Sequence, residues 1–279
     1  MDLKPKKLAV LIDADNSSIN SIEPVLEEIA KFGIASVKRV YGDWSSDTLK
    51  NWRDVLLPHA ITPVQQFAYT KGKDATDMIL IIDAMDLLYS GALDGFCIVS
   101  SDSDFTPLAS RIRESGLMVY GFGRKKTPEA FKKACDKFIF VENLVEEQER
   151  VRNNSESNIE ASDAAIKPAS KQHDIQKSDS VNSEVTLGSD DKKDIPTDVP
   201  IIDRATLNLI YKAVKDNTED NGWANLSLVG QYLTAVKPDF DSRNYGRAKL
   251  SGLIKLLNLF ETKIEDSQMY LKKKKKTGV

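Results

Sequence analysis

Residues 8–16, which read Leu-Ala-Val-Leu-Ile-Asp-Ala-Asp-Asn, join a short apolar run to two carboxylates and an amide. Five consecutive apolar residues with polar neighbours are typical of a strand buried on both faces, as in a parallel sheet. Asp13 follows the run directly, so we expect it at the carboxyl end of that strand. Ligands of open α/β sheets bind outside the carboxyl ends of the strands. This stretch therefore predicts a fold class and the edge of the sheet that carries a site.

Strand-like and helix-like segments alternate from residue 8 to about residue 141. We predict strands at 8–12, 34–41, 61–68, 95–99, 117–122 and 138–141, and helices at 17–32, 46–57, 76–89, 105–115 and 131–135. Strands that alternate with helices indicate parallel βαβ units. The predicted fold is therefore α/β, with a Rossmann-like parallel sheet that helices cover on both faces.

Composition narrows the chemistry that this chain can perform. The 279 residues suggest about two domains. The chain has only two histidines and two cysteines, which argues against histidine-rich zinc sites and disulfide frameworks. No apolar run is long enough to span a membrane, and residues 8–12 are too short for a signal-peptide core, so we expect a cytoplasmic protein. If the chain is an enzyme, carboxylates are the expected catalytic groups.

Four aspartates are predicted to meet at one edge of the sheet. Asp13 follows the first strand, Asp102 and Asp104 follow the strand at 95–99, and Asp77 opens the helix at 76–89. Clustered carboxylates repel one another, and a bound Mg²⁺ or Mn²⁺ relieves that repulsion. Such a metal site supports phosphodiester hydrolysis without histidine. The alternative for any single aspartate near a helix start, Asp15 included, is an N-cap.

The acidic motifs also carry a family resemblance. They are Leu-Ile-Asp13-Ala-Asp15-Asn16, Lys71-Gly-Lys-Asp-Ala-Thr-Asp77, Ser101-Asp102-Ser-Asp104-Phe105, Val119-Tyr-Gly121-Phe-Gly123 and Ala134-Cys-Asp136-Lys-Phe138. In this order they resemble the NYN domain, the LabA-like branch of the PIN-like nuclease superfamily, over roughly residues 6–145. The resemblance implies a metal-dependent ribonuclease that leaves 5′-phosphate and 3′-hydroxyl ends. It matches Asp13, Asp77, Asp102 and Asp104 to metal-binding positions and Asn16 to an amide that positions phosphate or water.

Basic side chains flank the predicted acidic edge. They are Lys71, Lys73, Arg124, Lys125 and Lys126. Lysine and arginine at such an edge can hold the phosphates of a nucleic-acid backbone. For any single lysine, an ordinary solvated surface position is the alternative.

The composition changes at about residue 149. Residues 151–200 lack Phe, Tyr and Trp, and we predict a disordered, acidic and serine-rich linker over 149–200. Helical patterns resume at 201–215, 226–236 and 245–257, followed by a hairpin of 259–264 with 268–271. Residues 201–279 carry 14 basic and 9 acidic side chains, which suggests a polyanion-binding module. We therefore expect domains at 1–148 and 201–275.

The second domain resembles another family. Gly222-Trp223-Ala-Asn-Leu226, Pro238-Asp-Phe240 and Tyr245-Gly-Arg-Ala-Lys249-Leu250 are similar to motifs of the OST-HTH/LOTUS domain, over roughly 200–272. That family implies a winged helix-turn-helix that binds RNA, with single-stranded G-rich and G-quadruplex RNA as suggested ligands. Its predicted contacts here are Arg243, Tyr245, Arg247 and Lys249, with Lys255 as a further candidate. Trp223, Tyr232 and Phe240 are more often core residues in so small a domain.

These observations favour an endoribonuclease with a tethered RNA-binding module. A flexible tether of 50 residues spans on the order of 40 Å, which lets the nuclease sample RNA that the second domain holds. Three alternatives remain open: a non-catalytic RNA-binding adaptor, a phosphatase that uses Asp13 as nucleophile, and a DNA-binding regulator. The sequence is compatible with a monomer or a dimer.

Overall fold

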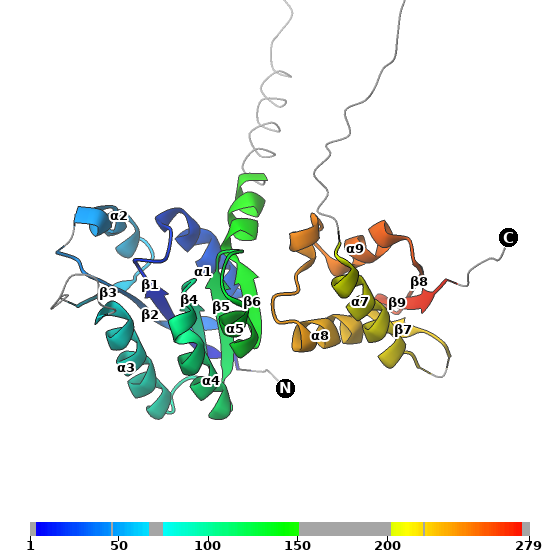
Figure 1. Cartoon of the computed structure of the whole chain (residues 1–279), viewed down its shortest axis with the longest axis horizontal. Coiled ribbons are helices and arrows are strands. Elements are labelled where there is room, and N and C mark those ends of the chain that lie inside the picture. The colour runs from blue at the N-terminus through cyan, green and yellow to red at the C-terminus, as the bar shows by residue number, and fades with distance from the viewer. Residues whose placement is uncertain (1–3, 46, 67–74, 151–201, 220, 275–279) are drawn as a thin grey trace, which may run out of the picture. The chain divides into compact units, whose positions relative to one another are not determined.

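The computed structural model describes residues 4–45, 47–66, 75–150, 202–219 and 221–274 (Figure 1). A six-stranded sheet with helices forms the N-terminal region, and helices with a three-stranded sheet form the C-terminal region. The predicted linker at 149–200 lies outside the described residues, apart from residues 149 and 150. Among the described residues, no helix is both long and apolar enough to cross a membrane.

The N-terminal sheet is parallel throughout. Its strands are β1 (Lys7–Asp13), β2 (Ile34–Gly42), β3 (Thr62–Gln65), β4 (Gly95–Val99), β5 (Met118–Gly123) and β6 (Lys137–Phe140). They lie in the order β3-β2-β1-β4-β5-β6, and each neighbouring pair is parallel. Successive strands therefore lie on one side of β1 up to β3 and on the other side from β4 to β6. The crevice between β1 and β4 is the topological switch point at which open α/β sheets bind ligands.

Helices cover both faces of this sheet. They are α1 (Ile22–Ala30), α2 (Arg53–Leu56), α3 (Ala75–Tyr89), α4 (Thr106–Glu114) and α5 (Glu129–Ala134), and residues 141–150 are also helical. Alternate residues of β1 point to opposite faces. Leu11 packs in the core that contains α3, α4 and α5, whereas Val10 packs in the core that contains α1. This double burial explains why the strand is apolar at every position from Leu8 to Ile12.

The helix predicted at 46–57 has a different form. Residues Asp47–Trp52 make a 3₁₀ helix (η2), and only Arg53–Leu56 continue as α-helix. Leu49 and Trp52 are buried against the α1 side of the sheet. A spacing of three residues is one turn of a 3₁₀ helix, so the tighter winding lets both side chains face the core.

The C-terminal region contains three helices and a small antiparallel sheet. The helices are α7 (Arg204–Asp216), α8 (Leu226–Val236) and α9 (Leu250–Leu257), and the strands are β7 (Ala224–Asn225), β8 (Phe260–Glu265) and β9 (Gln268–Lys273). The strand order is β7-β9-β8. The helix predicted at 245–257 begins only at Leu250, because Gly246 has a φ of +69° and ends a separate 3₁₀ turn at Ser242–Tyr245.

Candidate active site at the carboxyl ends of β1 and β4

Asp13 is the last residue of β1 and is almost completely buried, with 1% of its surface exposed. Its Oδ1 accepts hydrogen bonds from the backbone amides of Asp15 at 3.1 Å and Asn16 at 3.3 Å. Its Oδ2 accepts from Asn16 Nδ2 at 2.9 Å and from Ser100 Oγ at 2.7 Å. These four donors match the roughly four lone-pair positions of a carboxylate. Asp13 therefore holds the loop after β1 and the end of β4 together.

Ser100 connects this buried carboxylate to the acidic loop after β4. The residue directly follows β4 and is 1% exposed. Its hydroxyl donates to Asp13 and accepts from the backbone amide of Asp102 at 3.1 Å. One hydroxyl thus fixes Asp102 relative to Asp13 across the switch point of the sheet.

Asp102 is an N-cap, and Asp104 lies two residues beyond it in the first turn of the helix. Asp102 Oδ1 accepts from the backbone amide of Asp104 at 2.9 Å and begins the 3₁₀ helix Ser103–Phe105 (η3). Asp102 is half-buried and Asp104 is exposed. The capping role and a ligand role are compatible, because the capping hydrogen bond uses one of the two carboxylate oxygens of Asp102.

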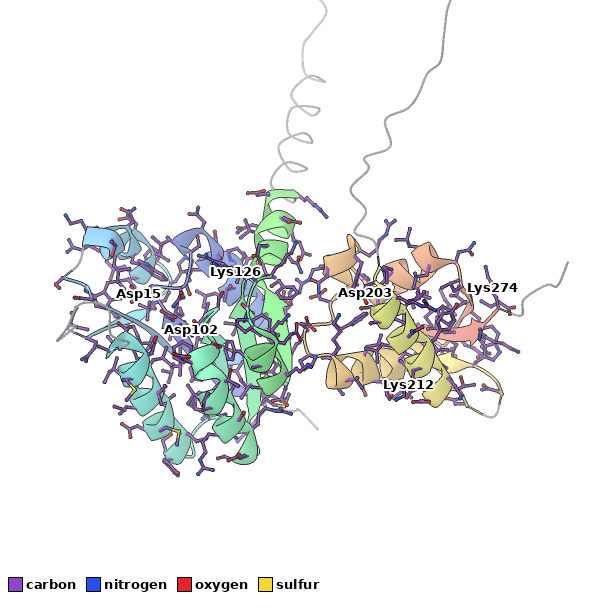
Figure 2. All side chains as sticks on the ribbon, in the orientation of Figure 1. Asp15, Asp102, Lys126, Asp203, Lys212 and Lys274 are labelled. Carbon is purple, nitrogen blue, oxygen red and sulfur yellow. The ribbon has the colours of Figure 1, made fainter. Side chains whose placement is uncertain are left out.

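Asp15 links the loop after β1 to the start of α3. The pKa of its carboxyl is raised by desolvation and by the charges of Asp13 and Asp43, while a hydrogen bond with the Thr76 side chain lowers it. Thr76 and Asp77 form the first turn of α3. Asp15 therefore belongs to the same acidic edge as Asp77, and Figure 2 labels it there together with Asp102.

Asp43 is a member of this edge that sequence reasoning missed. It directly follows β2, and its Oδ1 accepts from Gln65 Nε2 at 2.9 Å at the end of β3. Its position directly after β2 was the available signal, and it was weaker than that of Asp13 because β2 mixes polar and apolar residues. Asp83 and Asp86, by contrast, lie outside the site. Asp83 pairs with Arg39 and Tyr41, and Asp86 is exposed on α3.

The donor chemistry of this edge suits a hard divalent cation, because Mg²⁺ and Mn²⁺ prefer oxygen ligands. The described side chains are not close enough together to form a complete metal site, however. Within residues 4–45, 47–66, 75–150, 202–219 and 221–274, no three Asp, Glu, His or Cys side chains are grouped to hold a metal. Lys71, Lys73 and Asp74 lie outside the described residues. The described residues thus present the expected carboxylates at one edge without a formed three-ligand cluster.

A basic loop borders the acidic edge. Arg124 and Lys125 are exposed directly after β5, and the Arg124 amide donates to Ser101 Oγ at 2.9 Å. A small pocket beside this bond is lined by Asn16, Ser17, Ser101 and Arg124, among others. Gly123 allows the close approach, since a Cβ there would lie 2.6 Å from the Ser100 carbonyl oxygen.

The four predicted RNA contacts of the C-terminal region are in different environments. The Arg243 guanidinium pairs with Asp241 at 2.7 Å. Tyr245 is buried, and its hydroxyl lies 3.1 Å from Thr206 Oγ1, so its ring is part of the core rather than a surface for base stacking. Arg247 and Lys249 are exposed. These two side chains therefore present positive charge to a ligand.

The sheet order and the acidic edge define a Rossmann-like α/β protein with carboxylates at its switch point. Family models identify residues 7–142 as an NYN domain and residues 202–270 as an OST-HTH/LOTUS domain. The chain therefore consists of an NYN domain followed by a C-terminal OST-HTH/LOTUS domain. This confirms both resemblances read from the motifs and the α/β fold class.

Other comparisons add little. A search of curated proteins finds no match. Among solved structures, a protein of unknown function from Vibrio parahaemolyticus is similar at 17% identity and a TM-score of 0.42, covering 50% of this chain and 95% of that chain. An uncharacterized protein from Nitrosomonas europaea is similar at 28% identity and a TM-score of 0.24, covering 38% of this chain and 97% of that chain.

Proposed function

We propose that this chain is a divalent-cation-dependent endoribonuclease whose NYN domain cuts RNA bound by its OST-HTH/LOTUS domain. The observation that carries the proposal is the Ser100 hydroxyl, which joins Asp13 to the Asp102 loop at the switch point of the sheet. A buried serine that fixes two acidic loops is expected where acid placement matters for chemistry. The NYN match over residues 7–142 supports the same reading.

Each acidic residue has a proposed role. Asp77, Asp102 and Asp104 would hold the cation together with Asp13, directly or through water. Bound Mg²⁺ or Mn²⁺ supplies a water of lowered pKa and offsets the charge that develops on the phosphate. Asn16, whose amide group is fixed by Asp13, would orient the scissile phosphate or the attacking water. Asp13 would also hold its neighbours in place, because its carboxylate accepts hydrogen bonds from both loops.

The basic loop after β5 would hold the RNA beside these acids. Arg124 is fixed through its backbone amide to Ser101, next to Asp102, so its side chain is positioned near the acidic edge. Lys125, with Lys71 and Lys73 from the segment before α3, would neutralise neighbouring phosphates. We propose domain limits of 1–148 and 201–275, joined by the linker 149–200, which lets one domain hold RNA while the other cuts it.

The test is cleavage of end-labelled single-stranded RNA by purified full-length protein. Wild type is incubated with Mg²⁺, Mn²⁺ or EDTA on a mixed-sequence and a G-rich RNA. We expect internal cuts with either metal, none with EDTA, and products that carry 5′-phosphate ends. Folded wild type that leaves both RNAs intact with both metals would refute the nuclease.

A non-catalytic RNA-binding adaptor is the second candidate. It is favoured by one observation: among the described residues, no three acidic or other ligand side chains are grouped for a metal. In that case Asp13 and Ser100 serve only to hold the loops together. RNA binding that is equally strong with Mg²⁺ and EDTA, without cleavage, would support this candidate.

A further inference from the structure

The small sheet of the OST-HTH/LOTUS domain has one buried and one outward face. Ala224 and Leu271 pair directly across β7 and β9, and both are fully buried in the domain core. Because side chains alternate along a strand, Tyr270 and Lys272 lie on the opposite face. Lys263 pairs with Tyr270 across β8 and β9 and shares that face. The outward face is therefore polar and aromatic.

Trp223, which precedes β7, lies among these lysines. Lys263 Nζ is 4.9 Å from the centroid of the Trp223 ring and 5.3 Å from that of Tyr270. Lys272 Nζ is 5.6 Å from the Trp223 centroid. The Trp223 ring therefore lies near the ammonium groups of both lysines, and the Lys263 ammonium group lies near both rings. We call Trp223, Lys263, Tyr270 and Lys272 the wing patch.

The wing patch is basic despite nearby acids. Lys263 pairs with exposed Glu265 at 2.6 Å, and Glu261 lies opposite Lys272 on the neighbouring strand. Residues 259–276 nevertheless carry six lysines and three acidic side chains. Exposed ion pairs such as Lys263 with Glu265 contribute little, so a phosphate can replace the carboxylate as partner.

Aromatic rings beside flexible ammonium groups suit single-stranded nucleic acid. An unpaired base can stack on an aromatic ring, and lysines can neutralise the phosphates on either side of it. The exposed Arg247 and Lys249 before α9 have charge without such a ring, since the nearby Tyr245 is buried. An unpaired base can therefore stack on the aromatic rings at the outward face of the sheet.

We propose that the wing patch binds single-stranded RNA, with Trp223 and Tyr270 stacking on bases and Lys263 and Lys272 contacting phosphates. On binding, the ammonium groups move from the ring faces to phosphates, and bases take their place. This proposal rests on RNA as the ligand of the proposed function and assigns that ligand to a surface distinct from Arg243, Tyr245, Arg247 and Lys249.

The first test measures binding of full-length protein to a fluorescent single-stranded RNA in EDTA, so that cleavage does not enter. Affinity is followed from low to moderate salt for wild type and for Lys263→Gln/Lys272→Gln. Each lost phosphate contact on single-stranded RNA lowers the slope of log K against log salt by about 0.7, so the double variant should lose about 1.4. The matched control is Lys212→Gln/Lys215→Gln on α7, which removes the same charge from exposed positions elsewhere and should leave the slope unchanged.

The second test separates stacking from charge. Trp223→Leu should weaken binding by about fivefold or more with an unchanged salt slope, because stacking carries no counterion release. Trp223→Phe should retain most affinity but lose the RNA-induced quenching of tryptophan emission, since Trp44 and Trp52 lie in the NYN domain. Circular dichroism melting verifies that each variant is folded.

Three outcomes would overturn the proposal. One is wild type that does not bind single-stranded RNA. Another is an unchanged slope for Lys263→Gln/Lys272→Gln. The third is loss of slope in Arg247→Gln/Lys249→Gln alone, which would place the RNA before α9. Because all binding is measured in EDTA, failure of the nuclease proposal would leave these results unaffected.

Discussion

Ser100 Oγ donates a hydrogen bond of 2.7 Å to Asp13 Oδ2, although the two residues are 87 positions apart in the chain. Both side chains are almost completely buried at the ends of neighbouring parallel strands. The same hydroxyl accepts from the Asp102 amide. A single buried group thus sets the relative positions of two acidic loops.

Ser100→Ala should impair both stability and cleavage. The substitution leaves Asp13 Oδ2 with one donor fewer in a buried setting, which costs about 1–3 kcal/mol of unfolding free energy. Loss of a residue that orients candidate metal ligands should reduce cleavage by about 10–100-fold. Urea unfolding and cleavage with Mg²⁺ measure the two effects. Ser103→Ala, a half-buried serine in the same loop, is the control, and an equal effect of both variants would contradict a special role for Ser100.

Asp15→Asn should stabilise the metal-free protein at neutral pH. The pKa of Asp15 is raised by desolvation and by the charges of Asp13 and Asp43, so the folded state binds a proton more readily than the unfolded state. Ionised Asp15 therefore destabilises the fold above this pKa, and the penalty disappears as the pH falls through it. Melting in EDTA should give a higher Tm for the variant at pH 7, with the difference shrinking toward acid pH. A lower Tm for the variant at pH 7 would show that the raised pKa does not govern stability here.

Asp203→Ala should destabilise the OST-HTH/LOTUS domain. Asp203 is the N-cap of α7, and hydrogen bonds from the Thr206 hydroxyl and amide lower its pKa. Removing such a cap costs about 1 kcal/mol. Because the folded pKa is depressed, the stabilisation is present above the ordinary aspartate pKa and is lost as the pH falls through the folded value. Asp203→Asn retains a cap and should lose less at pH 7; equal losses in the two variants would exclude capping as the cause.

Gly123→Ala should be poorly tolerated. The added Cβ would lie 2.6 Å from the Ser100 carbonyl oxygen and 2.8 Å from Phe138 Cζ, so β5 would have to move away from the site. Overpacking of this kind costs about 1–3 kcal/mol. Gly252→Ala in α9 is the matched control, because its nearest neighbours are 3.8 Å away. Thermal melting compares the two variants. A Tm of Gly123→Ala equal to that of wild type would argue against close packing of Gly123 on Ser100 and Phe138.

The sequence predicted the two strands that carry the site and the edge of the sheet at which their acidic residues lie. Asp13 directly follows the apolar run of β1, and Asp102 follows that of β4 after two serines. The parallel pairing of these strands brings Asp13 close to the Asp102 loop. In the C-terminal region, the sequence did not predict the break at Gly246 that delays the start of α9 to Leu250. It also did not predict β7, a strand of only two residues that pairs with β9 and is too short for any periodic pattern.

Other features depend on contacts that sequence patterns do not encode. Ser100 looked like an ordinary residue of the loop after β4, because its role exists only once β1 lies beside β4. Tyr245 was predicted to contact RNA, but its ring packs in the small core of the domain and its hydroxyl hydrogen-bonds with Thr206. Asp43 escaped notice because only the pairing of β2 with β1 brings its charge near Asp15.

The central claim is that the acidic edge at the β1–β4 switch point cuts RNA. The most direct measurement compares cleavage of labelled single-stranded RNA in Mg²⁺ by wild type, Asp102→Asn and Asp86→Asn, the last a matched change at an exposed position of α3. Asp102→Asn keeps an N-cap oxygen, so folding is expected to persist. We expect Asp86→Asn to cut like wild type and Asp102→Asn, fully folded and still able to bind RNA, not to cut. Cleavage by Asp102→Asn at the wild-type rate would contradict this claim.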